Sequence, residues 1–196
     1  MTALRQTLKP AAAPGDAGLI SRAEAASLAA VETRYAVAVP RAVAALIDPA
    51  DADDPIARQF VPDARELLRQ PGEHDDPIGD ELKSPVAGIV HRYPDRVLLK
   101  AVSVCPVYCR FCFRRETVGP GKAAALSDAE LEAALAYIRG HSEIWEVILT
   151  GGDPLVMSPR RVAEITRALH ALVPAKLVRC PTRVPRLRPE RAPHQL

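Results

Sequence analysis

Three of the four cysteines stand close together, at a spacing that could hold a metal cluster. Cys105, Cys109 and Cys112 lie in the stretch CPVYCRFC, which has the spacing C-x3-C-x2-C. Three thiolates on one short loop can each bind one iron of a cubane iron–sulfur cluster, which leaves the fourth iron without a protein ligand. An iron of that kind can bind a substrate or a second cofactor. The spacing therefore predicts an iron–sulfur site, with the ring of Phe111 next to its last ligand.

Zinc binding and a disulfide are the alternative uses of these cysteines. A zinc site needs a fourth ligand at a typical finger spacing, and Cys180 is distant in the sequence. A disulfide would leave one of the three clustered cysteines over and is rare in a reducing cytoplasm. Cys180 is expected to be a buried, small apolar side chain at the end of a strand. A zinc or interaction module remains the alternative from a different class of protein.

A second candidate motif is the run Gly151-Gly152-Asp153-Pro154. Glycine lets the backbone approach a ligand closely, and Asp153 offers a carboxylate. Taken alone, the run is more often a plain turn between a strand and a helix than a ligand-binding motif.

These motifs need elements that position them, and a predicted strand precedes each one. Apolar stretches at 96–104, 146–150 and 176–180 predict three strands, the first of them buried on both faces. Helices are predicted at 128–139 and 159–172, where Ser127 and Ser158 precede the helical pattern. This order predicts right-handed crossovers in a parallel sheet, whose carboxyl edge carries the site in α/β folds.

The N-terminal third is predicted to be helical, with helices at 22–37, 41–47 and 63–68. Ser21 and Glu24 form a capping-box pattern before the first of these helices, and Pro40 and Pro62 precede the other two. The domain organisation is therefore expected to be a disordered leader at 1–20, a helical region at 21–83, an α/β region at 84–181 and a basic, Pro-rich tail at 182–196.

Composition excludes several other classes. The 196 residues include 26 Lys and Arg against 24 Asp and Glu, a net charge of +2, and 48% of them are hydrophobic. This is ordinary globular usage, unlike a strongly basic nucleic-acid binder or a disordered chain. No apolar run approaches the roughly 18 residues that span a bilayer. We expect a cytoplasmic protein without nucleic-acid or membrane partners.

The stretch CPVYCRFC resembles the signature of radical S-adenosylmethionine enzymes. The resemblance implies that Cys105, Cys109 and Cys112 hold a [4Fe-4S] cluster, whose open iron binds S-adenosylmethionine. Reduction by one electron then yields a 5′-deoxyadenosyl radical. Phe111 belongs to the cofactor-binding group in this interpretation. Gly151, Gly152 and Asp153 resemble the motif that contacts the amino group of S-adenosylmethionine.

Residues 84–115, TGGDPL and TRVP resemble more narrowly the lysine 2,3-aminomutase family. These isomerases move an amino group between adjacent carbons and also use pyridoxal 5′-phosphate. The resemblance implies that Arg92, Tyr93 and Arg96 bind pyridoxal phosphate and that Arg114 binds the substrate carboxylate. We expect the three arginines to flank the cluster loop. It also implies an amino-acid substrate such as lysine and a one-electron donor such as flavodoxin or ferredoxin. A branch that modifies elongation factor P is the alternative.

The family's remaining catalytic parts are not matched, so no catalytic residue is assigned. None of the lysines corresponds to the one that forms an aldimine with pyridoxal phosphate. The chain is also shorter than the roughly 250 residues of a complete barrel. The expected fold is therefore an α/β, partial TIM-like barrel with an N-terminal helical cap, C-terminally truncated and inactive by itself. The alternative function is that of a non-catalytic, metal-binding fragment. The unpaired edge of an incomplete sheet could also pair with a second copy, which would give a homo-oligomer.

Overall fold

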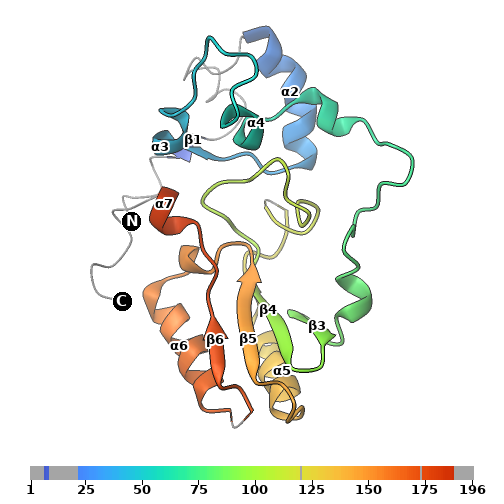
Figure 1. Cartoon of the computed structure of the whole chain (residues 1–196), viewed down its shortest axis with the longest axis vertical. Helices are drawn as coiled ribbons and strands as arrows, with labels where there is room; N and C mark the ends of the chain where they lie inside the picture. The colour runs from blue at the N-terminus through green and yellow to red at the C-terminus, as the bar shows by residue number, and fades with distance from the viewer. Residues whose placement is uncertain (1–6, 9–21, 120, 173, 188–196) are drawn as a thin grey trace. The chain divides into compact units, whose positions relative to one another are not determined.

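Figure 1 shows the computed structural model of the chain, which describes residues 7–8, 22–119, 121–172 and 174–187. These residues form two compact units. The helical unit contains the described residues of 1–77, 106–120 and 185–196. The sheet unit contains residues 78–105 and the described residues of 121–184.

The sheet unit is built on one four-stranded sheet with the order β3-β4-β5-β6. Its strands are β3 (Ile89–Tyr93), β4 (Arg96–Val102), β5 (Glu146–Gly151) and β6 (Leu177–Arg179). Strands β4, β5 and β6 are parallel, and helices α5 (Asp128–Arg139) and α6 (Pro159–His170) connect them (Figure 1). The prediction of a parallel βα arrangement is confirmed. The described sheet is open, as expected for a partial TIM-like barrel.

Helix α5 forms where local capping predicts it. The Ser127 hydroxyl accepts a hydrogen bond from the Glu130 backbone, and the Glu130 carboxylate accepts one from the Ser127 backbone. These two bonds satisfy amide groups that the first turn leaves unpaired. Leu131, Leu135 and Ile138 then lie on one face and are buried against the sheet.

Strand β4 is buried mainly on one face, which corrects the prediction of two buried faces. Val97 and Leu99 are at most 1% exposed and pack in one core with side chains of α5 and α6. Leu98 and Lys100 alternate with them and are only half-buried. Successive side chains on a strand point to opposite faces, so the two helices cover one of them.

Strand β3 is the element of this sheet that the sequence pattern did not predict. It pairs antiparallel with β4, with Ile89 opposite Leu99 and Tyr93 opposite Arg96. Its sequence, IVHRY, carries too few apolar residues to be recognised alone. The Nδ1 atom of His91 lies 2.8 Å from the Tyr137 hydroxyl, so this hydrogen bond connects β3 to α5.

The helical unit differs from its prediction in detail. Helix α2 ends at Arg34, α3 ends at Ala44, and the segment predicted to be helical at 63–68 is a 3-10 turn. Helix α4 was not predicted. The elements are β1 (Thr7–Leu8), α2 (Arg22–Arg34), β2 (Val39–Pro40), α3 (Arg41–Ala44), α4 (Ala57–Phe60) and η2 (Ala64–Leu67).

The predicted disordered leader and basic tail fall largely outside the described residues. Within the leader, β1 pairs antiparallel with β2, which corrects the expectation of disorder at those two residues. The Ser21 cap and most of the tail are not described. The described residues also form three short elements, namely η3 (Glu81–Lys83), η4 (Pro154–Val156) and α7 (Val184–Leu187). None of the helices in the described part of the chain combines the length and apolar character that crossing a bilayer requires.

Candidate functional site

The three clustered cysteines follow β4 and are divided between the two units. Cys105 stands three residues after β4 in the sheet unit, whereas Cys109 and Cys112 belong to the helical unit. All three are half-buried, and none forms a disulfide. The described residues do not bring three His, Cys, Asp or Glu side chains together as a metal site. The three-cysteine ligand set therefore stays a prediction, although reduced, partly accessible thiols are the donors that an iron–sulfur cluster needs.

A run of turns shapes the loop around Cys109 and Cys112. The Cys112 amide donates to the Cys109 carbonyl at 3.1 Å, and the Arg115 amide donates to the Cys112 carbonyl at 3.1 Å. Cys109 also packs against an apolar cluster that includes Val39, Phe60 and Val107. The segment between these two thiols is therefore shaped by its own backbone hydrogen bonds and by packing.

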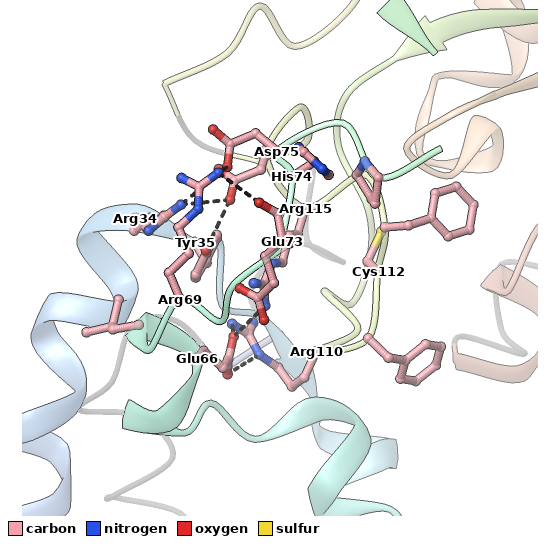
Figure 2. A pocket seen from close by; sticks show the side chains of 16 residues that line it. Arg34, Tyr35, Glu66, Arg69, Glu73, His74, Asp75, Arg110, Cys112 and Arg115 are labelled. Atoms are coloured by element: carbon pink, nitrogen blue, oxygen red, sulfur yellow. Dashed lines mark hydrogen bonds and ion pairs between the residues drawn. The ribbon is translucent and has the colours of Figure 1, made fainter. Parts of the chain in front are cut away.

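A charged pocket of about 460 Å³ lies beside this loop in the helical unit, and Figure 2 shows its lining. Phe111, Cys112 and Phe113 line it, and the two rings are 57% and 51% exposed. Its charged side chains are balanced, with four arginines against four acids: Arg34, Arg69, Arg110, Arg115, Glu66, Glu73, Asp75 and Glu116. Cys112 thus borders a polar cavity.

Arg34, the last residue of helix α2, and Tyr35 both bind Glu116, and all three residues line this pocket. The Tyr35 hydroxyl donates to the Glu116 carboxylate at 3.0 Å, and Arg34 donates to the same oxygen at 3.1 Å. The guanidinium carbon of Arg115 lies 4.4 Å from the centre of the Tyr35 ring. Burial and the hydrogen bond to Glu116 raise the pKa of Tyr35, so its phenol stays protonated at neutral pH.

The two glycines after β5 allow the loop to run against the end of β4. A Cβ atom on Gly151 would lie 2.2 Å from the Val102 carbonyl oxygen, and one on Gly152 would lie 2.2 Å from the Val104 carbonyl oxygen. Gly151 also has a φ of +103°, which L side chains rarely adopt. In this structure the backbone at these two glycines closely approaches the carbonyl groups of Val102, at the end of β4, and of Val104, just after it.

Asp153 binds this loop to the segment after β6. Its carboxylate is buried and accepts from the Thr182 hydroxyl at 2.6 Å, the Arg183 amide at 2.8 Å and the Leu155 amide at 3.0 Å. Burial, and then the charge of Asp153, raise the pKa of the Cys180 thiol. Asp153 therefore joins the carboxyl ends of β5 and β6. The role of Thr182 was not predicted, although TRVP was among the recognised motifs.

Asp153→Ala is expected to lower the free energy of unfolding by about 2–4 kcal/mol, because three part-buried hydrogen bonds to a buried carboxylate are lost. Asp128→Ala is the control, since its carboxylate pairs with Arg161 at the surface and is worth about 1 kcal/mol or less. Urea unfolding of the two variants measures the difference. Equal losses would show that the bonds of Asp153 contribute no special stability.

Arg92, Tyr93 and Arg96 lie at the end of the sheet away from the Gly-Gly-Asp loop. Arg96 pairs with Glu146 at the start of β5, whereas Val102 pairs with Gly151 at its end. A strand of this length separates its two ends by about 20 Å, at roughly 3.3 Å per residue. The start and end of one strand necessarily lie apart.

The arginines of this hairpin are also neutralised by different acids. Arg92 lies 3.6 Å from Asp80 and donates to the Ile78 carbonyl. Arg96 donates two hydrogen bonds to Asp95, at 3.0 and 2.8 Å. The assignment of Arg92, Tyr93 and Arg96 to a pyridoxal phosphate site stays a prediction. Arg114, the predicted substrate residue, has its guanidinium carbon 4.8 Å from the centre of the Phe113 ring.

The hairpin should respond to acid through Asp95. Hydrogen bonds from Arg96 and then from Trp145 lower the pKa of Asp95 to about 2. Because the folded pKa lies below the ordinary value near 3.9, this contribution to stability is present above about pH 4 and is lost as the pH falls through 2. Trp145 is the only tryptophan, so its fluorescence should report the change. Asp95→Asn is expected to remove that transition, and an unchanged titration would contradict the assignment.

Sequence comparison defines the class of protein to which these features belong. The profile of the radical SAM superfamily matches residues 100–193, which include the three clustered cysteines and the Gly-Gly-Asp loop. Over these residues the chain is therefore similar to the radical SAM superfamily.

Within that superfamily its sequence is related to the 2,3-aminomutases. It is 36% identical to L-lysine 2,3-aminomutase of Clostridium subterminale over 151 residues, which cover 77% of this chain and 36% of that protein. It is 38% identical over 138 residues to the lysine enzyme of Methanococcus maripaludis, covering 70% and 32% of the two chains. Glutamate 2,3-aminomutase of Clostridioides difficile is 34% identical over 161 residues, covering 82% and 38%. The aligned region thus spans less than half the length of these relatives.

Proposed function

We propose that Cys105, Cys109 and Cys112 bind a [4Fe-4S] cluster and that the chain uses it with S-adenosylmethionine in radical chemistry. The observation that carries the proposal is the superfamily match over 100–193, in which these cysteines appear at the required spacing after a parallel strand. The reduced thiols and the Gly-Gly-Asp loop after the next strand support it. When bound, the cluster supplies the electron that cleaves S-adenosylmethionine.

The chain's own residues position the site. Gly151 and Gly152 hold their loop against the end of β4, and Asp153 holds the same loop to Thr182 and Arg183. Phe111 and Cys112 border the charged pocket. The resemblance to the lysine 2,3-aminomutases implies pyridoxal 5′-phosphate as a further cofactor, and Arg92, Tyr93 and Arg96 are the residues proposed to bind it.

The reaction proposed for the whole protein is the migration of an amino group between adjacent carbons of an amino acid. Several of the matched relatives are named lysine 2,3-aminomutases, which favours lysine, and one is named for glutamate. The modification of elongation factor P is a second candidate for the use of the product. A flavodoxin or ferredoxin in the cytoplasm is the proposed electron donor.

Anaerobic reconstitution with iron and sulfide tests the proposal. We expect about four irons per chain and a brown chromophore, because the three thiolates complete a cubane cluster. Formation of methionine and 5′-deoxyadenosine after reduction then tests the use of S-adenosylmethionine, and lysine and glutamate are compared as substrates. Stoichiometric zinc without iron would instead identify a non-catalytic metal-binding module.

A further inference from the structure

Arg110 stands between two of the proposed cluster ligands, yet its side chain is directed into the helical unit. Its guanidinium is only 8% exposed and donates to Glu66 at 2.9 and 2.5 Å. A third guanidinium nitrogen donates to the Ala36 carbonyl at 2.9 Å, and the Arg110 amide donates to the Gln59 carbonyl at 2.8 Å. Arg110 therefore attaches the cysteine loop to three separate segments of the N-terminal region.

Glu66 is the acceptor on which this attachment depends. Its carboxylate is 11% exposed, and in Figure 2 it faces the Arg110 guanidinium. The same carboxylate lies 3.8 Å from Arg115 and accepts a hydrogen bond from the Asp63 amide at 3.0 Å. It thus contacts one arginine before Cys112 and another after it. Because Asp63 and Glu66 form the capping box of η2, the carboxylate is itself held in place.

The geometry of the Glu66–Arg110 pair is better suited to positioning the cysteine loop than to stabilising the fold. A buried ion pair contributes little net stability, because each charge must give up its water. A bidentate arginine–carboxylate contact does, however, fix both distance and direction. Arg110 is one residue from Cys109 and two from Cys112, so fixing it restricts both Cα atoms to within about 8 Å. Holding ligands in place before metal binding reduces the ordering cost of binding.

We propose that the Glu66–Arg110 ion pair positions the Cys109–Cys112 turn for cluster binding, so that both are positioning residues for the metal centre. The proposal rests on the proposed function, since it concerns the same cluster. It assigns a role to Glu66, which is 44 residues from Arg110 in the sequence.

The test compares iron retention by reconstituted wild type, Arg110→Gln and Glu66→Gln during competition with a chelator. Each variant should lose iron about 10–100-fold more readily, the usual effect of removing a group that orients a metal ligand. The double variant should lose iron no faster than the single variant that loses it faster, because the two side chains act as one unit. The matched control replaces the exposed pair Arg58–Asp53 of the same unit by Gln and Asn and should retain iron like wild type.

The reduction potential gives a readout that a merely structural role would not move. Arg110→Gln leaves the negative charge of Glu66 unbalanced and should lower the cluster potential, whereas Glu66→Gln should raise it. Thermal unfolding of the apo variants identifies any variant that fails to fold. If Arg110→Gln fails to fold, Arg110→Lys replaces it, because lysine keeps the positive charge but cannot make the two-nitrogen contact with Glu66. Folded variants with wild-type iron retention and potential would overturn the proposal. Wild type without a cluster would instead refute the proposed function.

Discussion

Cys109→Ser is expected to remove cluster binding, with iron per chain falling at least tenfold after anaerobic reconstitution. Loss of groups that only orient a ligand costs about 10–100-fold, so loss of a ligand should cost no less. Serine is close to cysteine in size, and Cys109 packs against Val107 and Phe60, so the local fold should persist. Iron analysis and the absorbance of the reconstituted protein measure the effect.

Cys180→Ser is the matched control for this variant. Cys180 is also half-buried, and it packs against the core of the sheet unit after the end of β6. Burial and the charge of Asp153 raise the pKa of its thiol, which keeps it protonated and makes it a poor metal ligand. The control should bind iron like wild type. Full cluster absorbance in Cys109→Ser would contradict the ligand assignment.

Gly151→Ala is expected to cost about 4 kcal/mol or more in the free energy of unfolding, or to prevent folding. The new Cβ would lie 2.2 Å from the Val102 carbonyl oxygen, and this neighbour is backbone in the pairing of β4 with β5. The φ of +103° adds backbone strain of about 1–3 kcal/mol. Relief of the contact would require separating the two central strands.

Gly121→Ala separates these two causes. Gly121 has a similar positive φ of +80°, but a Cβ there would meet nothing within 4 Å. This variant should show only the strain of about 1–3 kcal/mol. Urea unfolding of both variants provides the comparison. Equal destabilisation would mean that the contact with β4 is relieved at little cost.

Elements governed by neighbouring residues were predicted well. Helix α5 begins after Ser127, because its capping box lies within four residues, and β5 follows an apolar, β-branched run. The segment after Asp63 shows the limit of this local information. A helix was predicted at 63–68, but the segment is a 3-10 turn with a capping box that was not predicted, and the Glu66 carboxylate also binds Arg110. Nothing near Glu66 in the sequence identifies that partner.

The sequence by itself determined the cysteine spacing, the similarity to the radical SAM superfamily and the order of strands and helices, since these depend on residue types and short-range periodicity. Tertiary structure alone decided that Asp153 joins β5 to Thr182 and that Glu66 holds Arg110. It also placed Arg92 and Arg96 at the end of the sheet away from the Gly-Gly-Asp loop. The physical reason is that buried polar groups must find partners wherever folding brings them, and strand direction determines which side chains share an edge.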